Sequence, residues 1–421
     1  MNRRSIAILL ALVLGLAAGA LVDADLAPGV LAVTRPIARL WLDGLTMTVV
    51  PLVFALVVTG IAGAADSAGT GRTAPLALAW FAGTLVGMCL LAAAFTTLAL
   101  QFWPVPTGAR LLQGSGAAVS LAPAADWFAG IIPTNPVKAA ADTAMVPLVV
   151  FALAMGFGAA RIAPASRAAL LGAIRGLGET MLVIVGWVLW LAPLGVFALA
   201  FGVGATAGLG AAGVLVHYLA IIIAMCLAAT LLAIGLAVIA GRIAPAAFLR
   251  AALPAQIVAM STQSSLAALP AMVDSAPALG IGRDSAGIVL PLAVSVFRAA
   301  SAAANVAVAV YLAAVHGVEL GAGVLIMGAL VAAAVSVAAV GLPAQVSYFA
   351  VVGPVCLAMG VPTALLPLLL AIETLPDMFR TLGNVTADLA VTRIVGRRLP
   401  QVAAVEADAV VPILAQRRAN G

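Results

Sequence analysis

Charge is scarce in this 421-residue chain. Charged residues make up 8% of it, whereas hydrophobic residues make up 65% and the mean hydropathy is +1.23. A soluble domain of this size could not expose so much apolar surface without aggregating. The composition therefore excludes a soluble globular protein, and the lipid bilayer is the expected surrounding.

Cysteine and histidine are almost absent, with three and two residues respectively. Cys89, Cys226 and Cys356 lie in apolar sequence without the spacing of metal ligands, so neither a disulfide framework nor a zinc site is expected. His217 and His316 are isolated, and neither a nucleophile elbow nor a phosphate-binding loop is present. We expect no enzymatic activity, no cofactor, and no metal beyond a transported sodium ion.

Basic residues outnumber acidic ones by twenty to fifteen, and a net charge of +5 can indicate a nucleic-acid partner. Their positions argue against that partner. With the N-terminus inside the cell, fourteen fall in cytoplasmic segments and four in external ones, and Arg298 and Arg380 fall within the membrane. This bias predicts a multi-pass protein of the inner (plasma) membrane with both termini in the cytoplasm.

Long apolar runs predict the spanning helices, because each has the roughly 20 residues that a span needs. The first run could be a signal peptide, but its continuation through Leu21 favours an uncleaved helix. The expected fold is an all-α polytopic membrane protein with eight transmembrane helices. The runs are centred near residues 14, 52, 88, 150, 190, 224, 299 and 380.

Two further apolar stretches, roughly residues 248–276 and 321–361, are interrupted at the middle. The first break is polar and ends at Ser264 and Ser265, and the second contains Gly341-Leu342-Pro343. Lipid cannot satisfy the freed backbone groups, so each break must line a cavity or be buried in protein. We expect two re-entrant helical hairpins whose tips offer N–H groups to anions. The alternative is two spanning helices, one with a serine-rich packing face and one with a proline kink.

A polar stripe interrupts the last apolar run. Its residues recur at spacings of three, four and seven, so they share one face of a helix. They are Glu373, Asp377, Arg380, Thr381, Asn384 and Asp388. Ionisable groups at bilayer depth are costly and normally mark a substrate or ion pathway. The alternative is a helix end whose charges reach the headgroups, but mostly apolar residues lie on both sides.

The order of these pieces resembles the glutamate transporter family, the dicarboxylate/amino acid:cation symporters, over nearly the full length. Residues 377–388 are similar to the family pattern Asp-Met-x-Arg-Thr-x-x-Asn-Val-x-x-Asp. Ser264 and Ser265 stand where the family has its first hairpin tip, and Gly341 and Leu342 stand at the second. Weaker matches lie at residues 50–54, 132–136, 146–148 and 192–198.

The resemblance implies a homotrimer. Each protomer would have a fixed scaffold of about residues 5–63 and 128–203 and a mobile transport core of about residues 71–102 and 211–395. Residues 396–421 would form a cytoplasmic tail. The core would carry its cargo across the membrane in an elevator-like movement.

The resemblance also implies a substrate site on the polar stripe. Asp377 would bind a substrate amino group, Arg380 a carboxylate, and Thr381 and Asn384 further substrate oxygens. A guanidinium pairs bidentately with a carboxylate, which agrees with the role of Arg380. Asp377 lies within helical reach of Arg380, so an internal salt bridge is the alternative for it.

Cations or protons would enter at neighbouring groups of the stripe. By the resemblance, Asp388 would bind a cation, and Asn384 could keep a remaining sodium site with it. Glu373, Asp377 or Asp388 could instead take up a proton. The hairpin tips would complete the site, with the hydroxyl groups of Ser264 and Ser265 and with N–H groups on a substrate carboxylate.

The chain departs from the family pattern where the family binds sodium. The family's seventh helix carries Asn-Met-Asp-Gly-Thr, and residues 297–301 here read Phe-Arg-Ala-Ala-Ser. In the third helix, Phe81 and Leu85 stand around a retained Thr84. A hard cation needs about five or six oxygen ligands, so we expect fewer sodium sites than the family has.

Arg298 stands in the middle of a span in place of these ligands, with Ser301 and Asn305 on its face. Its fixed charge is expected to replace a bound sodium ion or, with Ser301, to anchor an anionic substrate. The alternative is snorkelling to a headgroup. Three carboxylates and two arginines leave about one negative charge, so a dianion should enter together with cations or protons.

These observations predict a secondary active transporter that moves a small dicarboxylate or acidic amino acid with protons or a reduced set of sodium ions. Two alternatives belong to other classes. One is a membrane protein that binds its ligand without transport, and the other is an uncoupled anion channel or carrier of the same fold.

Overall fold

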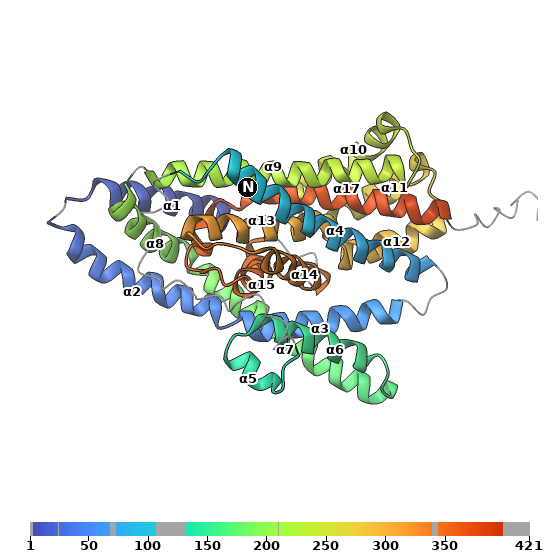
Figure 1. Ribbon diagram of the computed structural model, residues 1–421, viewed down its shortest axis with the longest axis horizontal. Coiled ribbons are helices and arrows are strands. Elements are labelled where there is room, and N and C mark those ends of the chain that lie inside the picture. Colours follow the sequence, from blue (N-terminus) through green and yellow to red (C-terminus); the bar gives the residue numbers. More distant parts are fainter. Residues whose placement is uncertain are drawn as a thin grey trace, which may run out of the picture.

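The computed structural model describes residues 3–23, 25–67, 73–106, 132–208, 210–338 and 344–398, and its regular structure in these ranges is helical (Figure 1). The helices are α1 (Arg3–Leu21), α2 (Ala27–Thr46), α3 (Val49–Ser67), α4 (Thr73–Phe102), α5 (Pro136–Ala141), α6 (Met145–Ala159), α7 (Pro164–Trp190), α8 (Ala192–Ala207), α9 (Gly210–Ile239), α10 (Pro245–Thr262), α11 (Ser265–Ser275), the 3₁₀ helix η2 (Pro277–Leu279), α12 (Arg283–Val296), α13 (Ala299–His316), α14 (Ala322–Ala338), α15 (Ala344–Ala358), α16 (Leu366–Ile372) and α17 (Thr374–Arg398).

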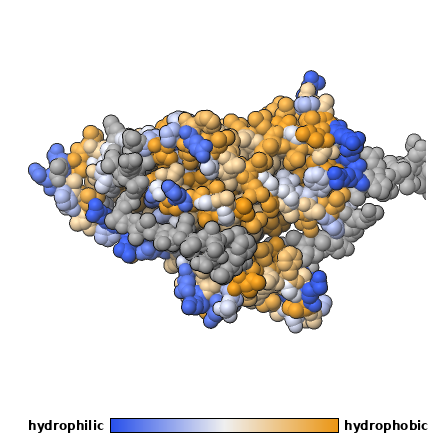
Figure 2. All heavy atoms as spheres, viewed as in Figure 1, coloured by the Kyte–Doolittle hydropathy of each residue, from blue (hydrophilic) through white to orange (hydrophobic). Residues whose placement is uncertain are grey.

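Several of these helices follow one another with only a short break. By length and composition, five helical stretches of the described residues could cross a membrane, and further apolar helices are shorter. The five are Ala27–Gly63, Thr73–Phe102, Pro164–Trp190, Ala212–Ile239 and Ser285–His316. The all-helical membrane fold is thus confirmed. In Figure 2, hydrophobic residues cover much of the middle and upper part of the face, and hydrophilic residues gather at the left end, at the upper right and on the lower edge.

The first interrupted stretch is a helical hairpin. Gln263 ends α10 in the left-handed conformation, with φ 55° and ψ 31°, and Ser264 caps α11 by accepting a hydrogen bond from Ala267 N (3.2 Å). Helix α11 has 11 residues and is therefore roughly 16 Å long, too short to span a bilayer. The two arms pack against each other. The alternative of a spanning helix is therefore wrong for this stretch.

The second interrupted stretch also forms two helices that pack on each other, α14 and α15. The predicted tip residues Gly341 and Leu342 lie outside the described residues. The expected tail from residue 396 is described only to Arg398, the last residue of α17.

Helix α13 lies at the centre of the bundle and packs against α4, α9, α14, α15 and α17 (Figure 1). It begins with a run of alanines, and nearly all of its residues are buried. A helix that is apolar all round has no solvent-facing side, and small residues let neighbouring helices approach closely. The polar stripe of α17 faces this crowded interior.

Helices α1 and α8 pack closely along their length. A Cβ atom added at Gly19 would overlap the backbone carbonyl oxygen of Phe201, and one added at Gly15 would lie 2.7 Å from the carbonyl oxygen of Phe197. Gly15 and Gly19 form a Gly-x-x-x-Gly pattern, which allows such close backbone contact. The sequence analysis did not single out this pattern.

We therefore expect Gly19→Val to destabilise the protein, by about 2 kcal/mol for an overpacked contact. The matched control is Gly172→Val on α7, because a Cβ there meets nothing within 4 Å. Thermal unfolding of the purified variants in detergent measures the difference. Equal midpoints for the two variants would show that α1 and α8 can move apart without a loss of stability.

Candidate functional site

Two helix breaks meet at the centre of the molecule. Helix α12 ends at Phe297 and α13 starts after Arg298, whose backbone is non-helical (φ −108°, ψ 62°). The carbonyl oxygen of Arg298 accepts the first helical hydrogen bond of α13, from Ala302 N (2.9 Å), and a second one from Ser336 Oγ of α14 (3.2 Å). Glu373 separates α16 from α17, and the N–H of Asp377 is bonded to its carbonyl oxygen (2.9 Å). The backbone carbonyl groups at both breaks therefore have hydrogen-bond donors within the protein, as buried backbone requires.

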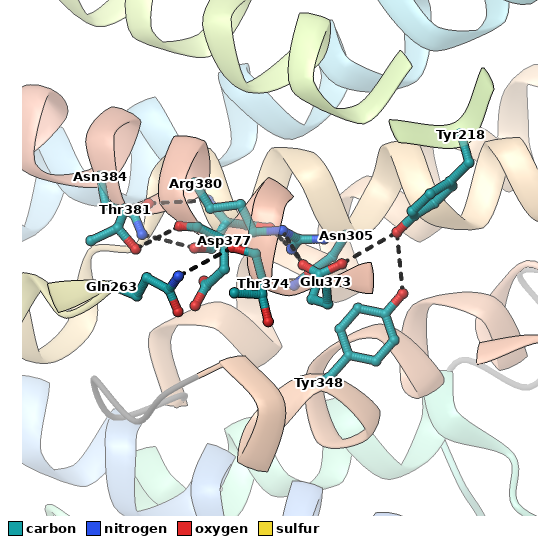
Figure 3. A network of polar contacts seen from close by, with 11 residues as sticks. Tyr218, Gln263, Asn305, Tyr348, Glu373, Thr374, Asp377, Arg380, Thr381 and Asn384 are labelled. Atoms are coloured by element: carbon teal, nitrogen blue, oxygen red, sulfur yellow. Dashed lines mark hydrogen bonds and ion pairs between the residues drawn. The ribbon is translucent and has the colours of Figure 1, made fainter. Parts of the chain in front are cut away.

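All six residues of the polar stripe are buried, and none has more than 3% of its surface exposed. Figure 3 shows Glu373 and Arg380 beside Asn305 of α13, with Tyr348 of α15 near Glu373. No charge of the stripe reaches the surface of the protein. The alternative interpretation of the stripe, a helix end whose charges reach the headgroups, therefore disagrees with the structure.

Arg380 is held by three neighbours within the site (Figure 3). Its Nε lies 2.7 Å from Glu373 Oε1, and its Nη1 donates to Asn305 Oδ1 (2.6 Å) and to the carbonyl oxygen of Ser301 (3.4 Å). Its Nη2 is buried and has no hydrogen-bond partner among the residues that the structure describes. A buried guanidinium edge without a partner is costly, and a carboxylate is the group that fits it best.

The ion-pair partner of Arg380 is Glu373, seven residues earlier in the chain. The sequence analysis considered an internal salt bridge only between Asp377 and its neighbours on the helix. Glu373 has helical backbone angles (φ −63°, ψ −22°), and its carbonyl oxygen accepts the N–H of Asp377. The spacing of seven thus put both side chains on one helix face, but it did not indicate a direct pair, because two helical turns separate them.

Two tyrosines complete the surroundings of Glu373. Tyr218 of α9 donates its hydroxyl to Glu373 Oε2 (3.3 Å), and its oxygen lies 3.3 Å from the hydroxyl of Tyr348 on α15. Both rings are buried. A buried tyrosine hydroxyl normally needs a polar partner, so the three tyrosines of this apolar chain were a usable signal that the sequence analysis missed.

Asn384 clamps α17 to the first turn of α13. Its Oδ1 accepts a hydrogen bond from Ser301 N (3.0 Å), and its Nδ2 donates to Ser301 Oγ (2.8 Å). Thr381 donates its hydroxyl to the carbonyl oxygen of Asp377 (2.8 Å). Ser301 and Asn384 therefore lie together as expected, and Ser301, Thr381 and Asn384 all form hydrogen bonds within the protein.

Arg298 and Asp388 are two further buried charges. The charge of Arg298 interacts with the carboxylates of Asp377 and Asp388 and with the guanidinium of Arg380. Asp388 is fully buried, and neither of its carboxylate oxygens has a hydrogen-bond partner among the described residues. Arg298 is thus the nearby positive charge that balances Asp388, rather than a snorkelling residue.

An aromatic pair stands beside Arg298. Phe81 of α4 stacks on Phe297, with ring centroids 4.6 Å apart and ring planes inclined by 16°. Both rings are buried. Apolar rings thus occupy two of the positions where the sequence departs from the family pattern around its sodium ligands, and rings offer no oxygen to a hard cation.

The first hairpin tip touches the start of α17. Gln263 Nε2 donates to the carbonyl oxygen of Thr374 (3.2 Å, Figure 3). Ser265 is buried, but the Ser264 hydroxyl is engaged in capping α11. The structure therefore brings this tip to the site through Gln263, a residue to which the sequence analysis gave no role.

The arrangement is suited to an anion that carries a carboxylate. Two guanidinium groups lie in one buried region, and one of them has an unpaired edge. Three carboxylates surround them, so a further negative charge needs a compensating proton or cation. Glu373 and Asp388 are the groups best placed to supply that compensation.

Comparison with known proteins identifies the relatives of this chain. The profile of the sodium:dicarboxylate symporter family matches residues 5–398. A C4-dicarboxylate transport protein of Deinococcus radiodurans is 26% identical over 93% of this chain and 88% of its own length. The proton/glutamate-aspartate symporter of Escherichia coli is 25% identical over 86% of this chain and 84% of its own length.

A further relative, a C4-dicarboxylate transport protein of Solibacter usitatus, is 27% identical over 68% of this chain and 66% of its own length. The family match covers the helices, both hairpins and the polar stripe. It is a family of transporters rather than of enzymes. The chain belongs to the sodium:dicarboxylate symporter family.

Proposed function

We propose that this protein is a secondary active transporter that carries a small dicarboxylate or acidic amino acid, with a substrate carboxylate bound at Arg380. The observation that carries the proposal is the buried, unpartnered Nη2 of Arg380. The relatives named above transport C4-dicarboxylates, or glutamate and aspartate with protons. A guanidinium binds either class through the carboxylate that they share.

We further propose that the coupling ion is a proton and that Glu373 accepts it. A substrate carboxylate that pairs with Arg380 competes with Glu373, which already holds Nε at 2.7 Å. Displacing an ionised Glu373 would leave a buried charge without its cation, at a cost of several kcal/mol. Protonation of Glu373 removes that cost, and the neutral carboxyl can still accept the Tyr218 hydrogen bond. Substrate and proton would therefore enter together.

A sodium ion at Asp388 and Asn384 is the second candidate for coupling. The two unpartnered oxygens of Asp388 favour it. Two observations weigh against it, because the Asn384 oxygen already accepts a hydrogen bond from Ser301 N and because Arg298 places a positive charge nearby. Removal of sodium separates the two candidates.

For the movement, we propose the scaffold of residues 5–63 and 128–203 and the mobile core of residues 71–102 and 211–395, with an elevator-like displacement. The packing supports this division, because α1 packs on α8 and α3 on α6 and α7, whereas α13 packs on α4, α9 and α17. The homotrimer, the inner-membrane location and the cytoplasmic termini belong to the same proposal.

Reconstitution into liposomes tests the proposed function. Labelled succinate, fumarate and aspartate are each offered with an imposed proton gradient, a sodium gradient or neither. Accumulation of one of them above its external concentration supports a coupled carrier. Saturable binding without uptake indicates a ligand-binding protein, an alternative that the loss of the sodium motif at Phe297 favours. A current without stoichiometric cargo indicates a channel.

Arg298→Met is expected to change the ion dependence of uptake. The substitution leaves Asp388 buried without the positive charge that now balances it, so a cation must fill that role or the affinity for acidic cargo must fall. Uptake measured with and without sodium should show either a new sodium requirement or weaker substrate binding. Unaltered substrate and ion dependence would show that Arg298 is structural.

A further inference from the structure

A groove of about 640 Å³ lies between α4 and α9, outside the site around Arg380. On α4 it extends from Leu76 to Leu91, which corresponds to about 22 Å at the helical rise of 1.5 Å per residue. One leaflet of a bilayer has a hydrocarbon depth of roughly 15 Å. The groove is therefore long enough to follow an acyl chain through one leaflet.

Glycines keep the walls of this groove smooth. Gly83 and Gly87 of α4 and Gly235 of α9 line it, and a Cβ atom added at any of them would meet nothing within 4 Å. Both helices therefore leave space here that side chains of ordinary size would fill. Most of the other lining residues are apolar, so the space suits a hydrocarbon chain rather than a polar solute.

One end of the groove carries positive charge. Arg398, at the end of α17, lines the groove, and its guanidinium carbon lies 4.7 Å from the centre of the Trp80 ring. Stacking uses the flat face of a guanidinium and leaves its in-plane N–H donors for a phosphate. Three more arginines lie close to Arg398, because the charge of Arg397 interacts with that of Arg398 and also with those of Arg242 and Arg393.

Two of these neighbours are already anchored to the protein. Arg393 donates to the carbonyl oxygens of Gly241 (3.1 Å) and Gly280 (3.0 Å), and Arg397 donates to that of Ala240 (3.3 Å). The cluster is thus fixed next to the groove despite the mutual repulsion of its charges. An anion beside it would relieve that repulsion.

We propose that this groove binds one anionic phospholipid, with an acyl chain along Gly83 and Gly87 and the headgroup phosphate on Arg398. The apolar groove supplies the fit for the chain, and the arginine cluster selects a headgroup with net negative charge. This lipid site is separate from the transport site at Arg380. Its role is to hold the end of α17 against α4 and α9.

Tryptophan quenching tests the proposal directly, because Trp80 lies in the groove. The full-length protein in nonionic detergent is titrated with phosphatidylglycerol or phosphatidylcholine brominated on the acyl chain near the headgroup. The signal of Trp80 is the difference between the wild type and Trp80→Phe. We expect phosphatidylglycerol to quench it at a concentration about fivefold lower, the effect of roughly one arginine at a membrane surface.

Two variants and a competitor complete the test. Arg398→Gln should remove the preference for phosphatidylglycerol, and Gly87→Leu should abolish quenching by filling the groove. Arg161→Gln and Gly172→Leu, both at sites outside the groove, should change neither. Equal quenching of Trp80 by the two lipids would overturn the proposal. So would full competition by inorganic phosphate alone, which would indicate a site for a free anion.

Discussion

Arg380→Ala is expected to abolish uptake of every acidic substrate. The variant loses the guanidinium that binds the substrate carboxylate, and Glu373 is left as a buried charge without its ion-pair partner. Truncating one partner of a buried, hydrogen-bonded charge pair between protein and ligand costs about 2–5 kcal/mol of binding, which corresponds to a loss of affinity of at least about 30-fold. Equilibrium binding of labelled substrate to the purified variant measures the effect.

A double variant separates binding from folding. Arg380→Ala with Glu373→Gln removes the unpaired charge as well, so it should regain stability but not substrate binding. Arg393→Ala is the matched control on the same helix, because Arg393 donates its hydrogen bonds to the carbonyl oxygens of Gly241 and Gly280 rather than to a residue of the polar stripe. Recovery of uptake in the double variant would show that Arg380 serves only to neutralise Glu373.

Glu373→Gln is expected to uncouple transport from protons. A glutamine is neutral at every pH, as Glu373 is when protonated, so Arg380 would always be available to the substrate. The variant should exchange internal for external substrate at a rate that no longer depends on pH, and it should lose accumulation driven by a proton gradient. Counterflow and gradient-driven uptake in proteoliposomes measure these two activities separately.

Glu179→Gln provides the matched control for this variant, because Glu179 is an exposed carboxylate on α7. It should keep both activities and their pH dependence. If Glu373→Gln still accumulates substrate with a proton gradient, the proton is carried by another group. Asp388→Asn would then be the next variant, because both carboxylate oxygens of Asp388 are buried without a hydrogen-bond partner among the described residues.

The sequence predicted the helical hairpins and the buried stripe because both depend on local pattern. A polar break inside an apolar stretch cannot face lipid, and the structure places the first break at Gln263 and Ser264 as expected. Residues three and four positions apart share a helix face, so Arg380, Asn384 and Asp388 were predicted to lie together. The structure buries all three.

The contacts that define the site could not be predicted in this way. The Tyr218–Glu373 hydrogen bond joins residues 155 positions apart, and the Phe81–Phe297 stack joins α4 to the break before α13. Helical periodicity carries no information about which faces of separate helices meet. The resemblance to a family could not supply these contacts either, because Phe81 and Phe297 stand where this chain departs from the family pattern.

The most direct test of the central claim is the internal pH of sodium-free proteoliposomes during uptake. A trapped pH indicator records the lumen while labelled succinate, fumarate or aspartate is added outside without any imposed gradient. If Arg380 binds the substrate as Glu373 takes up a proton, uptake should acidify the lumen in proportion to the cargo that enters. Uptake that requires sodium, or that leaves the internal pH unchanged, would contradict this account.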